Sequence, residues 1–409
     1  MKKAILPSLA LAAILLSSAS YAQTNKAYAI TGEAKGSYNW NAVREIDLTT
    51  GKVIRTIYDP ANAIQPFDAI TKAAIQVTQN ERYSVKALPM VTGVAAAAFD
   101  ARSNRLYFTN MRADELRYFD LSTNESKVFF VRGLGMAGGN KYDEANVITR
   151  MAFTADGTGY ALTNDGNNLV RFITDQKPQI TNLGQLIDGK KNGATSVHSQ
   201  CSSWGGDMVG DAYGNLYLVS MRNHIYKINP ETRVADYIGA VKGLPADFTS
   251  NGLAVNDEGE MIVSSAVLSS NYYKINIATL EAAPLPKNED GVYNASDLAN
   301  SNLLYQRNSL AQDFVVKNEV KGNSAISIYP NPVTNRFFNV QFDKIPGGQY
   351  TLALTDISGR LVFIRALNIN VPGQMERIAI PRSAAGGMYL LKVTGGDKQT
   401  VYSDKIVVQ

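Results

Sequence analysis

Residues 208–229 read MVGDAYGNLYLVSMRNHIYKIN, and this stretch decides the fold. It contains a short strand that ends in a polar turn at Asp211, a bulky apolar strand from Leu216 to Val219, and an alternating strand that closes at Asn229. Asp, Asn and Gly tolerate the backbone angles of tight turns, so hairpins are expected between the pieces. The bulky middle piece is typical of a strand buried on both faces.

The same three-part unit recurs from residue 23 to about residue 310. Its closing positions Asp120, Thr174, Asn229 and Asn276 follow one another roughly every 50 residues, close to the length of one four-stranded propeller blade. A β-sandwich also has alternating strands, but it does not repeat one unit at a constant spacing. We therefore predict an all-β protein whose body is a β-propeller with five clear repeats.

Both ends of the repeat region are incomplete. The first copy begins at Lys26 without an inner strand, and residues 294–305 repeat only the first two strands. This pattern fits a ring closed by strands from both chain ends, which removes exposed sheet edges. We expect six blades, the sixth built around residues 294–318, and an inserted loop or hairpin at residues 60–90 that lies over one face.

The N-terminus has the organisation of a signal peptide. A positively charged start and an apolar run over residues 4–16 precede small residues, so cleavage is expected between Ala22 and Gln23. A membrane anchor is the alternative, but the run is shorter than the roughly 20 residues that span a bilayer. The only cysteine, Cys201, lies far from this site, which argues against a lipid anchor there and an intramolecular disulfide.

The charge balance argues against nucleic acid as the main partner. The chain has 40 Lys and Arg against 36 Asp and Glu, a formal charge of +4, and removal of the signal peptide with its two lysines lowers it to +2. A nearly neutral chain lacks the basic footprint of nucleic-acid binding proteins.

A second domain begins at Ile326, where short strands start to alternate with turns. This spacing predicts a small Ig-like β-sandwich. The expected organisation is therefore a signal peptide at 1–22, a propeller domain at 23–312, a linker at 313–325 and the sandwich at 326–409.

Four motifs in this second domain closely resemble the type A sorting domain of the type IX secretion system. They are Tyr329-Pro330-Asn331-Pro332, Leu354-Thr355-Asp356-Ile357-Ser358-Gly359-Arg360, Gly387-Met388-Tyr389-Leu390-Leu391-Lys392-Val393 and Lys405-Ile406-Val407-Val408-Gln409. The resemblance implies a Bacteroidetes-type bacterium, export through the periplasm to the outer-membrane surface or the medium, and the type IX machinery and a surface sortase as partners. Attachment to lipopolysaccharide or release would follow. An adhesive sandwich module is the alternative.

Propellers usually bind ligands at the channel mouth where their inner strands begin. Arg150, Asp207 and Asn251 are predicted to lie there, with Asn294 or Ser296 from the closing blade. The segment at residues 250–254 resembles the strand start that carries a metal-binding Asn in gluconolactonase-type and regucalcin-like propellers, and the residues around Asp207 loosely resemble the start that carries their metal-binding Asp. This resemblance implies a Ca²⁺ site and a metal-dependent lactonase or hydrolase. For the further Glu ligand of those enzymes, the early part of the chain offers only Glu33, which matches poorly.

His198 and Trp204 lie in a polar loop that leads to the predicted mouth, and Trp40 lies on a Gly/Asn-rich hairpin tip. Aromatic rings among hydroxyls and amides suit stacking on a sugar or a peptide, whereas packing against a neighbouring blade is the alternative. Because no complete catalytic constellation is present, we expect a non-enzymatic module that binds a glycan, a peptide or a surface protein. The lactonase is the second hypothesis, and a structural envelope component is the third.

Overall fold

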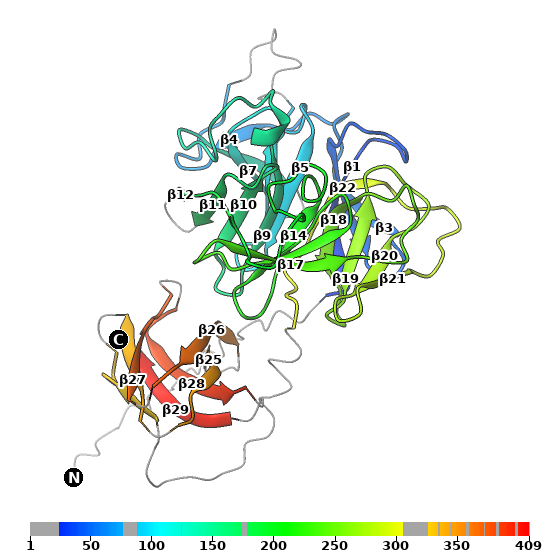
Figure 1. Ribbon diagram of the computed structural model, residues 1–409. Coiled ribbons are helices and arrows are strands. Elements are labelled where there is room, and N and C mark those ends of the chain that lie inside the picture. Colours follow the sequence, from blue (N-terminus) through cyan, green and yellow to red (C-terminus); the bar gives the residue numbers. More distant parts are fainter. Residues whose placement is uncertain are drawn as a thin grey trace, which may run out of the picture.

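The computed structural model describes residues 24–76, 88–123, 125–173, 178–305, 326–333, 336–343, 345–356, 360–371, 373–381, 384–396 and 400–408 (Figure 1). The predicted cleavage site at Ala22 and Gln23, the linker and Gly359 lie outside these residues. Strands dominate the described chain, with one 3₁₀ turn, η2 (Glu144–Asn146). In this described part, no helix is long and apolar enough to cross a membrane.

Five sheets form the body of the described chain. From the axis outward, the first blade contains β22 (Ala295–Ala299), β1 (Lys26–Thr31), β2 (Ala42–Asp47) and β3 (Val53–Tyr58). The second contains β5 (Val94–Asp100), β6 (Arg105–Asn110), β7 (Leu116–Asp120), β8 (Lys127–Val131) and β4 (Pro66–Asp68). The third contains β9 (Ile148–Phe153), β10 (Gly159–Thr163), β11 (Leu169–Ile173) and β12 (Gln179–Gly184). The fourth contains β14 (Asp207–Gly210), β15 (Leu216–Val219), β16 (His224–Ile228), β17 (Val234–Ala240) and β13 (Ile187–Asp188). The fifth contains β18 (Ser250–Val255), β19 (Met261–Ser265), β20 (Tyr273–Asn276) and β21 (Glu281–Pro284).

The inner strands contact one another in a ring, in the order β22, β5, β9, β14, β18 and back to β22 (Figure 1). This confirms the propeller, and the five sheets correspond to the five clear repeats. The sixth blade expected around residues 294–318 is not among the described sheets. Its first strand, β22, instead pairs with β1 in the register Ala29↔Leu298 and becomes the inner strand of the first blade.

A ring of only five blades brings the inner strands close to the axis, and the sequence there is correspondingly small. Strand β5 contains four consecutive alanines. A Cβ atom on Gly252 of β18 would lie 2.7 Å from the backbone nitrogen of Leu298 and from the carbonyl carbon of Asp297 on β22. Real side chains do not approach so closely, so glycine is required where β18 crosses β22.

The insertion at residues 60–90 contains a hairpin, as predicted. Its first strand, β4, runs parallel to β8 and extends the second blade at its outer edge. The turn that follows resembles the third-to-fourth-strand turn of a blade, because Asp68 accepts hydrogen bonds from the backbone of Ile70 and Thr71 as Asp47 does from the two residues at the same offsets. The hairpin therefore copies part of a blade at the edge of another.

The C-terminal domain is a two-sheet sandwich around one apolar core. One sheet contains β23 (Ile326–Tyr329), β24 (Phe337–Phe342) and β27 (Gln374–Ala379). The other contains β26 (Leu361–Ile369), β25 (Gly348–Asp356), β28 (Gly387–Gly395) and β29 (Thr400–Val408). The predicted Ig-like β-sandwich is thereby confirmed.

Candidate functional site

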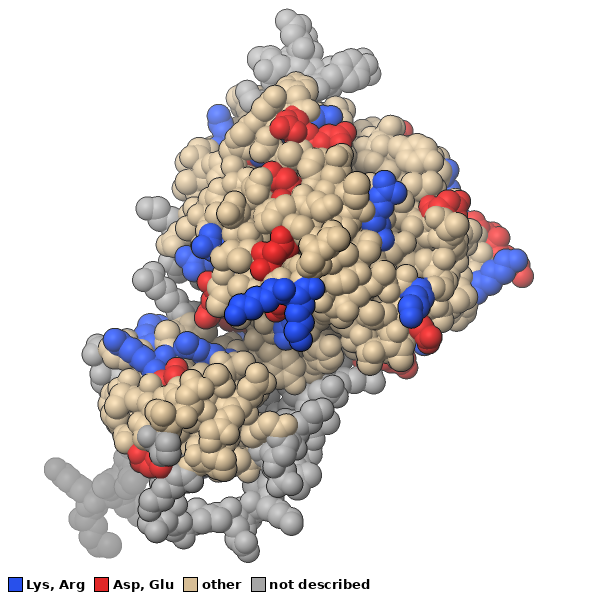
Figure 2. Space-filling view, viewed as in Figure 1, with Lys and Arg blue, Asp and Glu red and all other residues tan. Residues whose placement is uncertain are grey.

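The predicted ligand-binding residues lie on or just below one face of the propeller. Each inner strand begins at this face and the second strand of each blade returns to it. The loops between second and third strands, and the connections between blades, therefore lie there too. We call this surface the mouth face; it is formed by the loops at residues 32–41, 111–115, 132–147, 185–206, 220–223 and 266–272. In the view of Figure 2, acidic and basic side chains are interspersed over the propeller, in keeping with its small net charge.

Arg150, predicted near the mouth, is fully buried on β9. Its guanidinium donates to the carbonyl oxygens of Gly205 (3.0 Å), Thr163 (2.8 Å) and Asn164 (3.2 Å), and also to that of Ser203. Burial lowers the pKa of Arg150 to about 9, which leaves it charged at neutral pH. These four contacts tie a turn of the third blade to the loop that leads into the fourth.

His198 and Trp204 are brought together in that loop. The Trp204 indole N–H donates to the His198 carbonyl at 3.4 Å, and the indole is half-buried. The two ring nitrogens of His198 lie 2.8 Å from the Asp165 carbonyl oxygen and 3.1 Å from that of Leu186. A neutral imidazole can donate to only one of these oxygens. Both side chains thus hold the loop in place, and ligand binding by them stays a prediction.

Aromatic side chains also emerge from other loops of the mouth face. Trp40 is half-buried against the core, with its ring edge-on to Tyr38 at 5.9 Å between centroids. Tyr38 is 61% exposed and Tyr142, in the loop before β9, is 80% exposed. The Arg112 guanidinium lies 5.5 Å from the centre of the Tyr142 ring, a cation–π contact that restrains it. The rings of Tyr38 and Tyr142 are therefore available to a partner.

A pair of carboxyl groups, Asp207 and Asp297, lies at the axis beneath this face. Asp207 accepts hydrogen bonds from the backbone of Met208 (2.6 Å), Leu253 (2.7 Å) and Leu298 (3.4 Å), and Asp297 accepts one from Ala97 (3.0 Å). Both side chains are fully buried and interact directly, and the Oδ1 atom of Asp297 has no hydrogen-bond donor among the described residues.

Burial raises the pKa of both carboxyl groups well above the usual value, and for Asp297 the negative charge of Asp207 raises it further. The charge of Arg150 also acts on Asp207, although its N–H groups bind carbonyl oxygens elsewhere. Two carboxylates this close are stable when they share a proton. The pair joins β14 to β18, β22 and β5. Sequence reasoning found Asp207 but missed Asp297; the available signal was a single acid within the short apolar strand β22.

The side-chain oxygen of Asn251, the second predicted metal ligand, accepts hydrogen bonds from other groups of the protein. The donors are Thr249 Oγ1 (2.6 Å) and the Ala266 backbone (3.0 Å). Glu33 accepts one from Asn41 Nδ2 (2.9 Å). Within the described ranges, no three His, Cys, Asp or Glu side chains are grouped to hold a metal. The Ca²⁺ site at Asp207 and Asn251 therefore stays a prediction.

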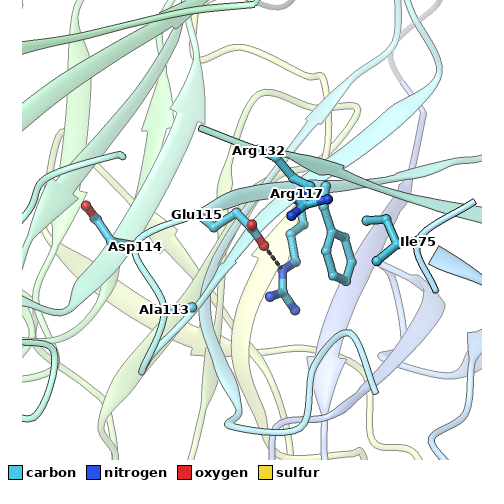
Figure 3. A pocket seen from close by; sticks show the side chains of 7 residues that line it. Ile75, Ala113, Asp114, Glu115, Arg117 and Arg132 are labelled. Carbon is cyan, nitrogen blue, oxygen red and sulfur yellow. Dashed lines mark hydrogen bonds and ion pairs between the residues drawn. The ribbon is translucent and has the colours of Figure 1, made fainter. Parts of the chain in front are cut away.

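A cavity of about 330 Å³ opens on the second blade, at the outer part of the mouth face (Figure 3). Such a volume lies at the small end of ligand sites. The cavity could not be predicted from the sequence, because its lining residues belong to separate segments that the inserted hairpin and the second blade bring together. The lining residues are Ile75, Ala113, Asp114, Glu115, Arg117, Phe130 and Arg132.

The motifs of the C-terminal domain hold its last strand in place. Asn331 donates through Nδ2 to the Lys405 carbonyl (2.7 Å) and accepts through Oδ1 from the Val407 backbone (2.9 Å). In the middle motif, the Arg360 side chain forms an ion pair with Asp356 at 2.9 Å. The flanking Pro330 and Pro332 each follow a cis peptide bond. The start of the domain is thereby fastened to its end.

The comparisons identify this domain. Residues 327–409 match the family described as the secretion system C-terminal sorting domain. The tail is thus a type IX sorting domain, and it indicates export to the cell surface or the extracellular space. No curated protein matches the chain.

Several solved structures are similar to the chain at low identity. PorZ, an essential surface component of the type IX secretion system of Porphyromonas gingivalis, is 14% identical, with 93% of this chain and 51% of PorZ covered and a TM-score of 0.30. The chain therefore spans about half the length of PorZ. A Bacteroides thetaiotaomicron protein of unknown function is 13% identical, with 67% and 70% covered and a TM-score of 0.39. Virginiamycin B lyase from Staphylococcus aureus is 10% identical, with 90% and 91% covered and a TM-score of 0.32.

Proposed function

We propose that this protein is a type IX-exported propeller that binds an extracellular glycan, peptide or surface protein through its mouth face, without catalysing a reaction. The observation that carries the proposal is the exposure of Tyr38 and Tyr142 on that face of a chain whose tail is a sorting domain. Tyrosine offers a flat apolar surface and a hydroxyl at little cost in side-chain entropy, which suits recognition of sugars and peptides.

The same proposal covers the route and its end. A signal peptide cleaved between Ala22 and Gln23 takes the chain to the periplasm, and the sorting domain takes it across the outer membrane. A surface sortase then removes the tail within the linker and leaves the propeller released or attached to lipopolysaccharide. Sorting-domain recognition is expected to depend on the intact fold that Asn331 fastens.

Export is tested in cells that carry either the full chain or a chain truncated after Gly322, followed by fractionation and surface proteolysis. We expect the full chain at the surface or in the medium and the truncated chain in the periplasm. Equal export of both would show that the tail is not needed for sorting in this protein.

Binding is tested with the purified full chain on glycan and peptide arrays and on intact cells. Tyr142→Ala and Tyr38→Ala should lose the signal, since each removes an exposed ring. Ile54→Ala is the matched control, because Ile54 is also exposed but lies on the outer strand β3. Loss of binding in the control alone would place the site elsewhere. Ca²⁺-dependent lactone hydrolysis that Asn251→Ala abolishes would favour the enzyme instead.

A further inference from the structure

Two acidic side chains and two arginines line the cavity on the second blade, and both acidic side chains form ion pairs. The Asp114 carboxylate forms an ion pair with Lys141 Nζ (3.1 Å). It also accepts hydrogen bonds from the backbone N–H groups of Ala137 (2.9 Å) and Gly138 (2.8 Å). Burial raises the pKa of Asp114, but these hydrogen bonds and Lys141 outweigh it, so the net pKa is lowered and the group stays ionised. This carboxylate therefore holds the adjoining loop and is already neutralised.

Glu115 and Arg117 form a second matched pair at 2.9 Å (Figure 3). The Arg117 side chain is 3% exposed, donates to the Pro89 carbonyl and lies 3.9 Å from the centre of the Phe130 ring, so its position is fixed. The Glu115 side chain is 27% exposed and keeps lone pairs on the cavity side that can accept further hydrogen bonds.

Arg132 is the cation that remains. It is exposed and, within the described part of the chain, has no ion pair or hydrogen bond. The positive charge of Arg132 contributes slightly to the lowered pKa of Asp68. That pKa is lowered mainly by hydrogen bonds from Thr71 and Ile70 in the same turn. The cavity thus combines one unpaired guanidinium, one carboxylate acceptor and an apolar wall formed by Ile75 and Ala113.

We propose that this cavity binds a sugar acid, with the ligand carboxylate on Arg132, its hydroxyl groups on Glu115, and the C–H face of its ring on the apolar wall. The inference rests on the proposed binding function, since it names a ligand class for one part of the mouth face. A guanidinium matches a carboxylate with two parallel hydrogen bonds. A neutral sugar lacks the anion, and a simple fatty acid lacks the hydroxyl donors that Glu115 requires.

The test is isothermal calorimetry on the full chain with D-galacturonate, D-galactose and hexanoate as probes. We expect galacturonate to bind and the other two to bind at least tenfold more weakly. Loss of one charge-assisted contact in Arg132→Gln should weaken galacturonate roughly tenfold or more, and Arg132→Lys should recover part of the affinity. Higher ionic strength should weaken binding, because the attraction is exposed to solvent.

Arg222→Gln is the matched control, because Arg222 is also exposed on the mouth face but belongs to the fourth blade. Absence of galacturonate binding, equal binding of galactose or hexanoate, or binding unchanged by Arg132→Gln would each overturn the inference. Failure here is distinguishable from failure of the proposed function: array binding that needs Tyr38 or Tyr142 but not Arg132 would leave the function standing and remove only this site.

Discussion

Asp297→Asn is a direct test of the carboxyl pair at the propeller axis. The amide oxygen of Asn can still accept the hydrogen bond from the Ala97 backbone, found at 3.0 Å, and its NH₂ group can donate to Asp207. The variant therefore reproduces, at every pH, the hydrogen bonding of a pair that holds one proton. It should be more stable than the wild type wherever the wild-type pair must keep a proton that the unfolded chain releases.

The magnitude follows from proton linkage. In the unfolded chain both aspartates ionise near pH 4, whereas burial raises both pKa values in the folded pair. The contribution of the pair to the free energy of unfolding is therefore fully present below the unfolded pKa and is lost as the pH rises through the folded pKa. For as long as the folded pair keeps one proton that the unfolded chain has released, each pH unit lowers the free energy of unfolding by about 1.4 kcal/mol.

The assay is urea unfolding of the full chain at pH 5, 6 and 7, with and without EDTA. Trp40 and Trp204 are the two tryptophans of the chain and both lie in the propeller, so their fluorescence reports on this domain. The stability advantage of Asp297→Asn over the wild type should grow with pH across this range, by about 1.4 kcal/mol for each pH unit over which the wild-type pair keeps its proton. Asp100→Asn is the control, since Asp100 is also buried on an inner strand but has Arg102 at 2.8 Å.

Parallel pH profiles for Asp297→Asn and the wild type would refute the shared proton. A wild type that EDTA destabilises, with no such effect on the variant, would show that a metal ion neutralises the two charges instead.

Three further outcomes are expected. Gly252→Ala should lower the free energy of unfolding by about 2 kcal/mol or more, because the new methyl group meets the backbone of Leu298 at 2.7 Å; a smaller loss in urea unfolding would mean that β18 and β22 can move apart. Arg150→Met should cost about 3 kcal/mol, since four carbonyl groups, buried or partly buried, lose their donor, and limited proteolysis should then cut near the Arg150 contacts first. Asn331→Ala should lower the unfolding temperature of the tail and leave the propeller transition unchanged, because it loses two hydrogen bonds, one of them from Val407; calorimetry separates the two transitions.

The repeated strand pattern could be predicted from sequence because each blade is built from local hairpins. The polar turns at Asp120, Asn229 and Asn276 and the buried strands between them depend only on nearby residues. The closure of the ring by a strand from the end of the repeat region could also be predicted, because the first copy of the repeat lacks an inner strand. The expectation of six blades exceeded the five observed, because residues 294–305 look like a new repeat but complete the first one.

The sites depend on contacts that no local pattern records. Asp207 and Asp297 lie on different blades, and only closure of the ring brings them together. Arg150 lies at the strand start where it was predicted. Its hydrogen bonds to the carbonyl groups of another loop depend on how two blades pack, which the local sequence does not show. The cavity depends on the inserted hairpin, which carries Ile75 to the rim of the second blade. The motif around Asn331 could be recognised from the sequence because the sorting domain has several characteristic motifs in a fixed order.

The position of β22 sets the order in which the propeller can be completed. Strand β22 pairs with β1, and Ser296 of β22 lies beside Ile30 of β1, 266 residues earlier in the chain. Four blades can form from neighbouring hairpins as synthesis proceeds, whereas β1 has to wait for a partner made at the end of the domain. Closing so long a loop is slow, so the edge of β1 stays open until then. A break in the chain after β22 would release the tail and leave the ring closed. A break before β22 would allow this strand to leave the first blade, the part of the propeller that is synthesised first.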